Sequence, residues 1–507
     1  MQGRIKTGGH VRTKAEVLNQ TTQKFLGAES RVRPATTWTE ELWYTLRLGG
    51  PLALGELGWM STYIVDALMI GRLPANYSPL AQASALVGNT IYYAIVFSAI
   101  YLLNGLETLV AQSFGQERSD ECLYLLAQSA WIVLFATPLV MGLTLGSLTL
   151  LPAFGVPHDV VVETGRYLRP LVLSTLPLML YMALRRYLQS INNVVWVSIS
   201  LVTAGVVNWF GDWVFLLGRM GVPSLGLAGS AWGTLVVRIY MLVLLAVGGT
   251  IATRRIGFVA TRDMLRPNWP RLRALLRIGW PSGLENLAEF GVSAFMSILS
   301  TRLGIVMAAA QDVVLNLNAF VYQVPNGLSY ATITRVGQAA GRNDREQVER
   351  AANVSLGIGV AFIAVAGLVF AVFSHFWAAL YSTNVQVIAA AAPIFTICAF
   401  LLLGDTVFTL LAYALTGLGD TRTPMLVSLV WNWGIGMPLA YALAFHYGFA
   451  LRGLWIGRGT ASLGTGITLL IFWRLRMRRD RRRASFNLIG AFRQPAAHPV
   501  QSAANPS

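Results

Sequence analysis

The chain of 507 residues is poor in cysteine, lysine and charge, with two cysteines and only 12% charged residues. Cys122 and Cys398 lie in apolar stretches, which excludes a disulfide framework. The lysines are Lys6, Lys14 and Lys24, so the sequence has no Gly-x-x-x-x-Gly-Lys phosphate-binding loop. The five histidines show no metal-ligand spacing. We therefore expect no cofactor and no structural metal, and uphill transport would draw on an ion gradient or a separate ATPase subunit.

Apolar residues make up 55% of the chain. A soluble chain would carry about 25% charged residues. Apolar runs that are long enough to span a bilayer recur along the chain, which predicts a polytopic membrane protein with helical spans. No apolar segment precedes Trp43, so we expect no cleavable signal peptide. We predict twelve spans, near 44–70, 80–104, 122–150, 160–190, 194–218, 225–250, 275–301, 307–333, 351–378, 385–416, 424–446 and 453–473.

An internal duplication relates the two halves of this pattern. Both copies begin with Leu-Arg-x-Gly-x-Pro, at Leu46–Pro51 and at Leu276–Pro281, an offset of 230 residues. Both close on Gln-x-x-Gly, at Gln112–Gly115 and at Gln338–Gly341. Because six predicted spans fall in each copy, both copies enter the membrane in the same direction. The sequence thus predicts an all-α fold of two parallel six-helix lobes.

The net charge of +16 is concentrated between and outside these lobes. Arginines fill the linker between the halves and follow the last span, and further cations precede the first span. This distribution fits the positive-inside rule rather than nucleic-acid binding, and it predicts that both termini and the linker are cytoplasmic. The predicted segments are an N-terminal tail (1–40), an N-lobe (41–252), a basic linker (253–270), a C-lobe (271–476) and a basic, disordered tail (477–507).

Carboxylates inside predicted spans are the strongest functional candidates, because each costs roughly 3 kcal/mol at mid-membrane. They are Glu56, Asp66, Glu107, Asp212, Glu285, Glu289, Asp312 and Asp405. Asn208 and Asp212 are spaced i, i+4 and share a helix face, which suits an ion or proton site; the alternative is a helix cap. Glu285 and Glu289 also share a face. Asp405 has no polar neighbour in sequence, and its alternative is a hydrogen bond without a transport role.

The two copies do not share these acids. At the offset of 230 residues, Asp66 corresponds to Met296 and Glu289 corresponds to Trp59. The common scaffold tolerates either position without charge, which favours a functional role. Aromatic residues near the acids would suit bulky organic cations, although core packing and interfacial belts are the alternative for many of them. They are Trp59, Trp209, Trp213, Phe290, Tyr413, Trp431 and Trp433.

Over about residues 44–475 the sequence resembles the multidrug and toxic compound extrusion (MATE) family. The resemblance rests on an ordered set of motifs rather than on any single one. The motifs are Val65-Asp66 with Gly71-Arg72-Leu73, Glu107–Gln112 with Gly115, Asn208 with Asp212, Gly226-Leu227 with Gly229, Val324-Pro325 through Arg335–Gly337, and Gly417–Arg422.

The resemblance implies a V-shaped pair of lobes, alternating access and antiport. Glu289 and Asp405 match the cation-coupling carboxylates of bacterial members. Asp66, Asn208 and Asp212 match the N-lobe set linked to proton coupling and drug binding.

Three further positions refine this resemblance. Pro51 matches the proline at which the first helix is proposed to bend. Asn316 stands where eukaryotic members tend to have glutamate, so the chain is similar to bacterial members. Leu401 stands where some sodium-coupled members carry tyrosine, which weakens a sodium assignment.

We predict a cation-coupled antiporter, driven by H⁺ or Na⁺, that exports organic cations and multiple drugs. It would be a monomer in the lipid of the inner membrane and not an enzyme. The candidate coupling residues are Asp405, Glu289, Asp66, Asp212 and Asn208, with transient Na⁺ at Glu289 and Asp405; the candidate cavity residues are Asn316, Glu285, Trp209, Phe290 and Tyr413.

Three alternatives remain at this point. A flippase for lipid-linked sugars or peptidoglycan precursors would need cationic cavity residues. The arginines cluster at span ends, such as Arg47, Arg277 and Arg335, which counts against it. A membrane-embedded enzyme would need clustered His, Ser or paired acids that face one membrane surface, and none is evident. A channel would be favoured by a flux assay that shows no gradient-driven accumulation.

Overall fold

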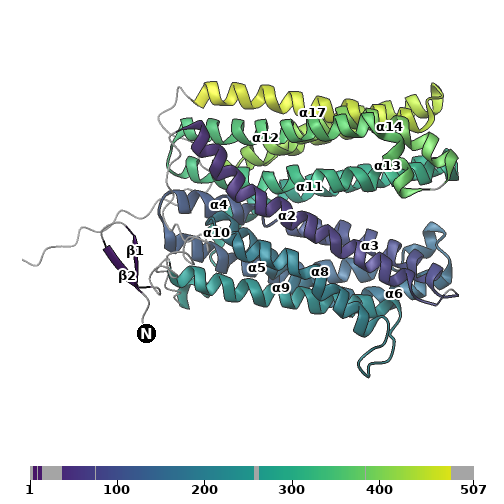
Figure 1. Ribbon diagram of the computed structural model, residues 1–507, viewed down its shortest axis with the longest axis horizontal. Coiled ribbons are helices and arrows are strands. Elements are labelled where there is room, and N and C mark those ends of the chain that lie inside the picture. Colours follow the sequence, from purple (N-terminus) through teal and green to yellow (C-terminus); the bar gives the residue numbers. More distant parts are fainter. Residues whose placement is uncertain are drawn as a thin grey trace, which may run out of the picture.

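The computed structural model describes residues 4–7, 10–13, 37–74, 76–255, 262–382 and 384–480. Long helices run roughly side by side along one direction (Figure 1). The first half, the N-lobe, contains α2 (Trp38–Gly71), α3 (Ser78–Tyr101), α4 (Asn104–Gly115), α5 (Ser119–Ser147), η1 (Leu151–Phe154), α6 (His158–Leu173), α7 (Thr175–Ser190), α8 (Val195–Phe215) and α9 (Leu227–Arg255).

The second half, the C-lobe, repeats this arrangement after a short 3-10 helix, η2 (Arg262–Leu265). It contains α10 (Trp269–Arg302), α11 (Ile305–Gly341), α12 (Arg345–Val372), α13 (Ser374–Tyr381), α14 (Val385–Gly417), α15 (Arg422–Leu429), the π-helical turn η3 (Val430–Gly436), α16 (Met437–Tyr441), a second π-helical turn η4 (Ala442–His446) and α17 (Ala450–Asp480). The predicted all-α membrane fold is confirmed.

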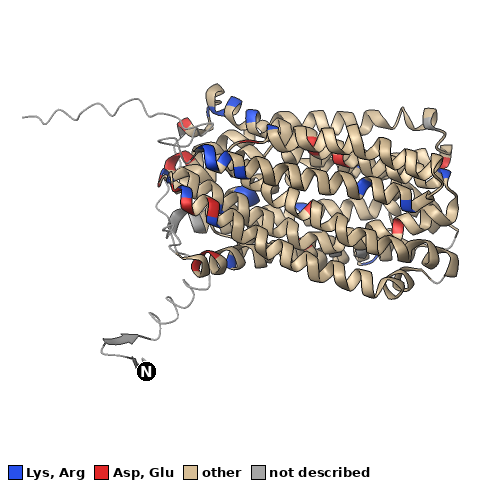
Figure 2. Cartoon of the chain, turned by 90° about the horizontal axis from the view of Figure 1, so that it is seen from above, with Lys and Arg blue, Asp and Glu red and all other residues tan. Residues whose placement is uncertain are grey.

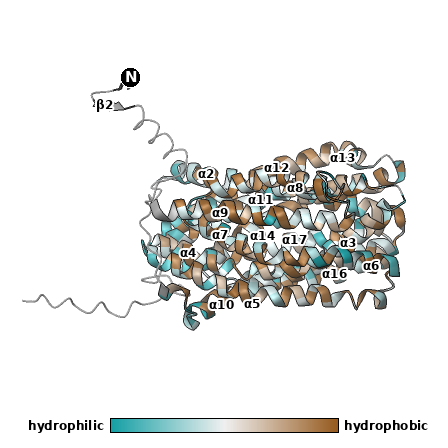
Figure 3. Cartoon of the chain, turned by 90° about the horizontal axis from the view of Figure 1, so that it is seen from below, coloured by the Kyte–Doolittle hydropathy of each residue, from teal (hydrophilic) through white to brown (hydrophobic). Residues whose placement is uncertain are grey.

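Eight helices of the described residues are long and apolar enough to cross a membrane, or nine if α6 and α7, bent by 44°, form one span. The helices α2, α10 and α17 are long enough, at 34, 34 and 31 residues, but carry more charged side chains. The prediction of twelve spans is therefore not confirmed in full. Hydrophobic residues lie along the length of the helices (Figure 3). Many are exposed, such as Leu86 and Phe135, as expected for a surface that faces lipid.

The first helix of each lobe packs against the other lobe. The N-lobe helix α2 contacts α8 of its own lobe and α11 of the C-lobe, and α10 contacts α3 and α4 of the N-lobe. Glycines allow this approach: a Cβ on Gly327 would lie 2.4 Å from the Cα of Ala53, and a Cβ on Gly279 would lie 1.9 Å from the carbonyl oxygen of Leu102. The first helix of each repeat thus lies at the interface and joins the two lobes.

Charged side chains gather at one end of the bundle (Figure 2). This end, here called the basic end, contains the start of α2, the start of α10 and the end of α17 (Figure 1). The residues before α10 are fastened to the N-lobe: the amide of Gln128 on α5 donates to the carbonyls of Met264 (3.0 Å) and Arg266 (2.8 Å), and its oxygen accepts from the Asn268 amide (2.7 Å).

The structure describes parts of the predicted N-terminal tail (1–40). Within it β1 (Arg4–Thr7) and β2 (His10–Thr13) pair antiparallel, consistent with their β-branched residues. The helix α2 already begins at Trp38 because Thr37 and Glu40 form a capping box. The predicted tail 477–507 lies outside the described residues from 481 onward.

Candidate functional site

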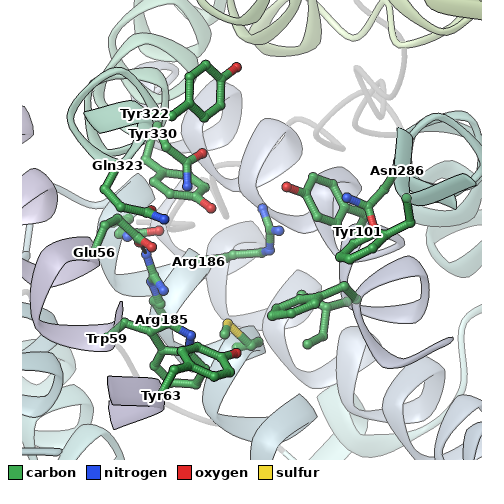
Figure 4. A pocket seen from close by; sticks show the side chains of 16 residues that line it. Glu56, Trp59, Tyr63, Tyr101, Arg185, Arg186, Asn286, Tyr322, Gln323 and Tyr330 are labelled. Atoms are coloured by element: carbon green, nitrogen blue, oxygen red, sulfur yellow. Dashed lines mark hydrogen bonds and ion pairs between the residues drawn. The ribbon is translucent and has the colours of Figure 1, made fainter. Parts of the chain in front are cut away.

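A cavity of about 340 Å³ lies between the lobes. Its aromatic walls come from α2, α3, α10 and α11, and its polar groups come mainly from α7 and α11 (Figure 4). The lining residues are Glu56, Trp59, Tyr63, Phe97, Ile100, Tyr101, Met182, Arg185, Arg186, Gln189, Asn286, Phe290, Tyr322, Gln323, Asn326 and Tyr330. The phenyl rings of Phe97 and Phe290, one from each lobe, stack with centroids 6.2 Å apart. Because both lobes contribute walls, relative motion of the lobes changes the cavity.

The cavity contains two arginines that the sequence analysis did not consider. Arg185 forms a buried ion pair with Glu56, and its guanidinium lies 5.1 Å from the ring centre of Tyr330. Arg186 donates to Glu107, with 2.7 Å between Nη1 and Oε2. Arg185 and Arg186 lie near the C-terminal end of α7 and nevertheless line the cavity, so the position of the arginines at span ends does not count against a flippase. Glu56 and Glu107 neutralise these buried arginines, since a buried unpaired charge is costly.

The N-lobe acids come together beside this cavity. Asn208 on α8 donates to Asp66 on α2, with 2.5 Å between Nδ2 and Oδ1. Asp212 lies one turn further along α8, is completely buried, and is close enough to Asp66 for the two carboxyl groups to interact. The predicted set Asp66, Asn208 and Asp212 thus forms one cluster. A Cβ on Gly233 would lie 2.9 Å from Asp212 Oδ1, so α9 closes the cluster on that side.

The C-lobe acids also meet, and an arginine joins them. Glu289 on α10 and Asp405 on α14 both lie beside Arg458 on α17. The Nη2 atom of Arg458 is 3.5 Å from Asp405 Oδ2 and 3.9 Å from Glu289 Oε1. The second arginine nitrogen, Nη1, donates to Asn432 Oδ1 at 3.2 Å. Sequence reasoning found both acids but missed their counter-charge.

A smaller cavity of about 70 Å³ adjoins the central cavity and is lined by Glu289 but not by Asp405. Glu285, Glu289 and Tyr413 line it, and it shares Tyr101, Asn286, Tyr322 and Asn326 with the central cavity. Three of the five predicted cavity residues therefore line a cavity: Glu285, Phe290 and Tyr413.

The other predicted positions lie elsewhere. Trp209 is 48% exposed on α8 and stacks on Trp213, and it lines neither cavity. Asn316 donates to the carbonyl of Asp312, one turn earlier in α11, and also lines neither cavity. Pro51 lies inside α2, and its carbonyl accepts from Ser198 at 3.2 Å. These three residues are not part of the contacts that form the central site.

Buried polar contacts join the two lobes at the basic end. Glu41 of α2 binds Arg335 of α11 through two hydrogen bonds of 2.8 and 2.7 Å, and both residues are buried. Thr108 of α4 donates to the carbonyl of Thr416 on α14 at 3.0 Å. These contacts close the gap between the lobes at the basic end, and the acids and the central cavity lie further along the bundle.

Comparison with known proteins identifies relatives that cover nearly the whole chain. The family model MatE matches residues 51–214 and 281–442, one segment in each lobe. A protein named "Probable multidrug resistance protein NorM" from Mesorhizobium japonicum is 30% identical over 459 residues, which covers 88% of this chain and 96% of that protein. "Multidrug resistance protein NorM" from Burkholderia vietnamiensis is 30% identical over 453 residues, covering 86% and 93%.

Solved structures share the fold at lower identity. A MOP superfamily transporter from Pyrococcus furiosus superposes with a TM-score of 0.80 at 18% identity, covering 87% of this chain and 97% of that chain. A eukaryotic MATE transporter superposes with a TM-score of 0.76 at 19% identity, covering 88% and 99%.

Proposed function

Because this chain belongs to the MatE family of multidrug transporters, we propose that it is a cation-coupled antiporter that exports small organic cations through the cytoplasmic membrane. The family assignment agrees with the resemblance seen in the sequence, and it makes the protein a transporter rather than an enzyme. The concentration of arginine at the basic end supports a cytoplasmic location for that end and for both termini. We further propose that the protein functions as a monomer.

The observation that carries this proposal is the position of Glu289. Its carboxylate belongs to the C-lobe acid pair and lines the small cavity that adjoins the central one. A bound organic cation and a coupling ion would therefore compete for the same negative charge, that of the Glu289 carboxylate. Competition of this kind couples the two binding events without a separate signal between distant sites. In the proposed cycle, ion binding at Glu289 and Asp405 weakens the hold on the drug, which then leaves on the outer side.

A matched pair of variants tests this function. Asp405→Asn removes a charge of the C-lobe pair with almost no change in shape, and Asp159→Asn removes a charge from an exposed position on α6. We expect gradient-driven ethidium efflux from cells that lack other efflux pumps to fall by about tenfold in Asp405→Asn. Asp159→Asn should match the wild type. Equal efflux in all three proteins would contradict the coupling role of Asp405.

The flippase remains the second candidate, because Arg185 and Arg186 place cations in the central cavity. Each arginine is paired with a glutamate, so the pairs add no net positive charge for a pyrophosphate. The double variant Arg186→Gln/Glu107→Gln, which leaves no buried charge of this pair unpaired, distinguishes the two functions. A flippase would lose binding of a lipid pyrophosphate, whereas ethidium binding in the proposed exporter does not require this charge.

A further inference from the structure

Arg458 occupies the place between Glu289 and Asp405 where a coupling cation would bind. One of its nitrogens, Nη2, lies within ion-pair distance of both carboxylates, at 3.9 and 3.5 Å. The arginine side chain is only 14% exposed, whereas Glu289 is 54% exposed. The guanidinium of Arg458 therefore already supplies a positive charge to Glu289 and Asp405, and this charge belongs to the protein itself.

The local fold holds this guanidinium in place. Arg458 follows Gly457, where a Cβ would lie 2.4 Å from the Ala440 amide nitrogen, so the absence of a side chain allows α17 to approach α16. The π-helical turn η3 contains Asn432, whose amide nitrogen donates to Ser428 at 3.1 Å. Its oxygen then accepts from Arg458. π-Helical turns are rare and frequently mark functional sites.

The N-lobe acids have a different arrangement. A buried arginine near that cluster, Arg238, donates hydrogen bonds to the hydroxyl groups of Tyr92 (2.6 Å), Tyr93 (3.5 Å) and Ser174. Among the described residues, no ion pair joins Arg238 to Asp66 or Asp212. The direct arginine contact is thus specific to the C-lobe pair.

A fixed guanidinium has a large effect on metal binding at this pair. Arginine stays protonated in proteins, so its charge persists at every physiological pH. Two like unit charges about 4 Å apart repel each other enough, at an effective dielectric constant of about 20, to lower affinity by roughly a thousandfold. Hard cations also require several oxygen ligands, and Arg458 already uses oxygens of Glu289, Asp405 and Asn432.

We propose that Arg458 acts as a built-in counter-cation that excludes sodium from the Glu289–Asp405 pair, which leaves the proton as the coupling ion of this chain. This inference rests on the proposed function. Among the described residues, the other ionisable groups that face the pair are Glu285 on α10, Tyr101 on α3, Tyr322 on α11 and Cys398 on α14. None of these groups supplies a second fixed positive charge, so Arg458 sets the ion selectivity of the site.

Sodium binding to the purified, full-length protein tests the proposal directly. Radioactive ²²Na⁺ binding is measured for the wild type, Arg458→Gln, Arg458→Lys and the double variant Arg458→Gln/Asp405→Asn. We expect saturable binding only in Arg458→Gln, over a range of sodium concentrations in which binding to the wild type does not saturate. The lysine variant keeps the charge and should stay without sodium, and the double variant should lose the binding that Arg458→Gln gains.

Two results would overturn the proposal. One is saturable sodium binding by the wild type that Arg458→Gln does not strengthen. The other, which needs no variant to fold, is sodium-driven export by the wild type in proteoliposomes. In the same proteoliposomes a proton gradient should drive export and a sodium gradient should not. If neither gradient drives export, the proposed antiport itself fails; if sodium drives it, only the role of Arg458 fails.

Discussion

Gly115 meets Gln338 across the two lobes, so closely that a Cβ on Gly115 would lie 2.2 Å from the main-chain oxygen of Gln338. The reciprocal contact exists as well: a Cβ on Gly341 would lie 2.1 Å from the main-chain oxygen of Gln112. The amide of Gln112 donates to the carbonyl of Gly417, and that of Gln338 to the carbonyl of Ser190, both at 2.8 Å. The Gln-x-x-Gly ends of the two repeats therefore form the contact that closes the basic end.

Gly115→Ala should open this contact. The added methyl group overlaps backbone atoms of Gln338, which cannot move aside as a flexible side chain could. We expect maleimide labelling of Ser190→Cys, which is buried in the closed contact, to become about tenfold faster in a background without Cys122 and Cys398. Gly142→Ala is the matched control, because a Cβ there meets nothing within 4 Å. Unchanged labelling in Gly115→Ala would contradict the closed contact.

Glu41→Gln should destabilise the protein, because it leaves the buried guanidinium of Arg335 without its charge partner. Breaking a buried pair on one side costs about 3 kcal/mol in the free energy of unfolding. Thermal unfolding in detergent, followed by intrinsic tryptophan fluorescence, measures the change. Glu346→Gln is the control, since Glu346 is 82% exposed in its pair with Arg350 and should have almost no effect. Equal melting of the two variants would argue against the stabilising role of Glu41.

Asp66→Asn tests the N-lobe cluster independently of Asp405. The change keeps the side-chain shape but removes the negative charge of the carboxylate that accepts the hydrogen bond from Asn208. We expect proton-driven ethidium efflux to fall by about tenfold. Asn208→Ala removes only the donor and should have a smaller effect. Wild-type efflux in Asp66→Asn would show that the N-lobe acids do not take part in coupling.

Phe290→Ala should weaken binding of aromatic cations in the central cavity. It removes one of the two stacked rings that face each other across the lobes. A cation–π contact in a desolvated site contributes about 2 kcal/mol, so we expect the half-saturating ethidium concentration to rise by roughly tenfold. Phe135→Ala is the control, because Phe135 is 72% exposed on α5. A similar change in both variants would place the drug outside this cavity.

Hydropathy and the internal repeat were sufficient to predict the helical lobes, and the family resemblance grouped the acids, but neither identified the arginines that pair with them. Hydropathy locates a span along the chain without fixing which neighbour its polar residues face. Arg458 lies in a run of small residues, Gly457-Arg458-Gly459, and more than 50 residues separate it from Asp405. An intramembrane arginine costs as much as an acid. Applying the same criterion to cations would have selected Arg185, Arg186 and Arg458.

For a related reason, the sequence did not predict which aromatic residues line the cavity. Trp209 and Phe290 both lie near acids in sequence, yet Trp209 is exposed on α8 and Phe290 lines the cavity. A tryptophan at a membrane surface and one in a binding site have the same sequence signature. Only the rotation of each helix about its axis separates the two cases, and that rotation depends on packing against helices distant in sequence.

The Gln-x-x-Gly contacts are related by a pseudo-two-fold axis. A six-helix protein that associated with its own copy about a two-fold axis would make the Gly115–Gln338 type of contact twice, as an isologous dimer does. The two repeats of this chain thus pack as the subunits of such a homodimer would, whereas their acids differ, with Asp66 corresponding to Met296 and Glu289 to Trp59.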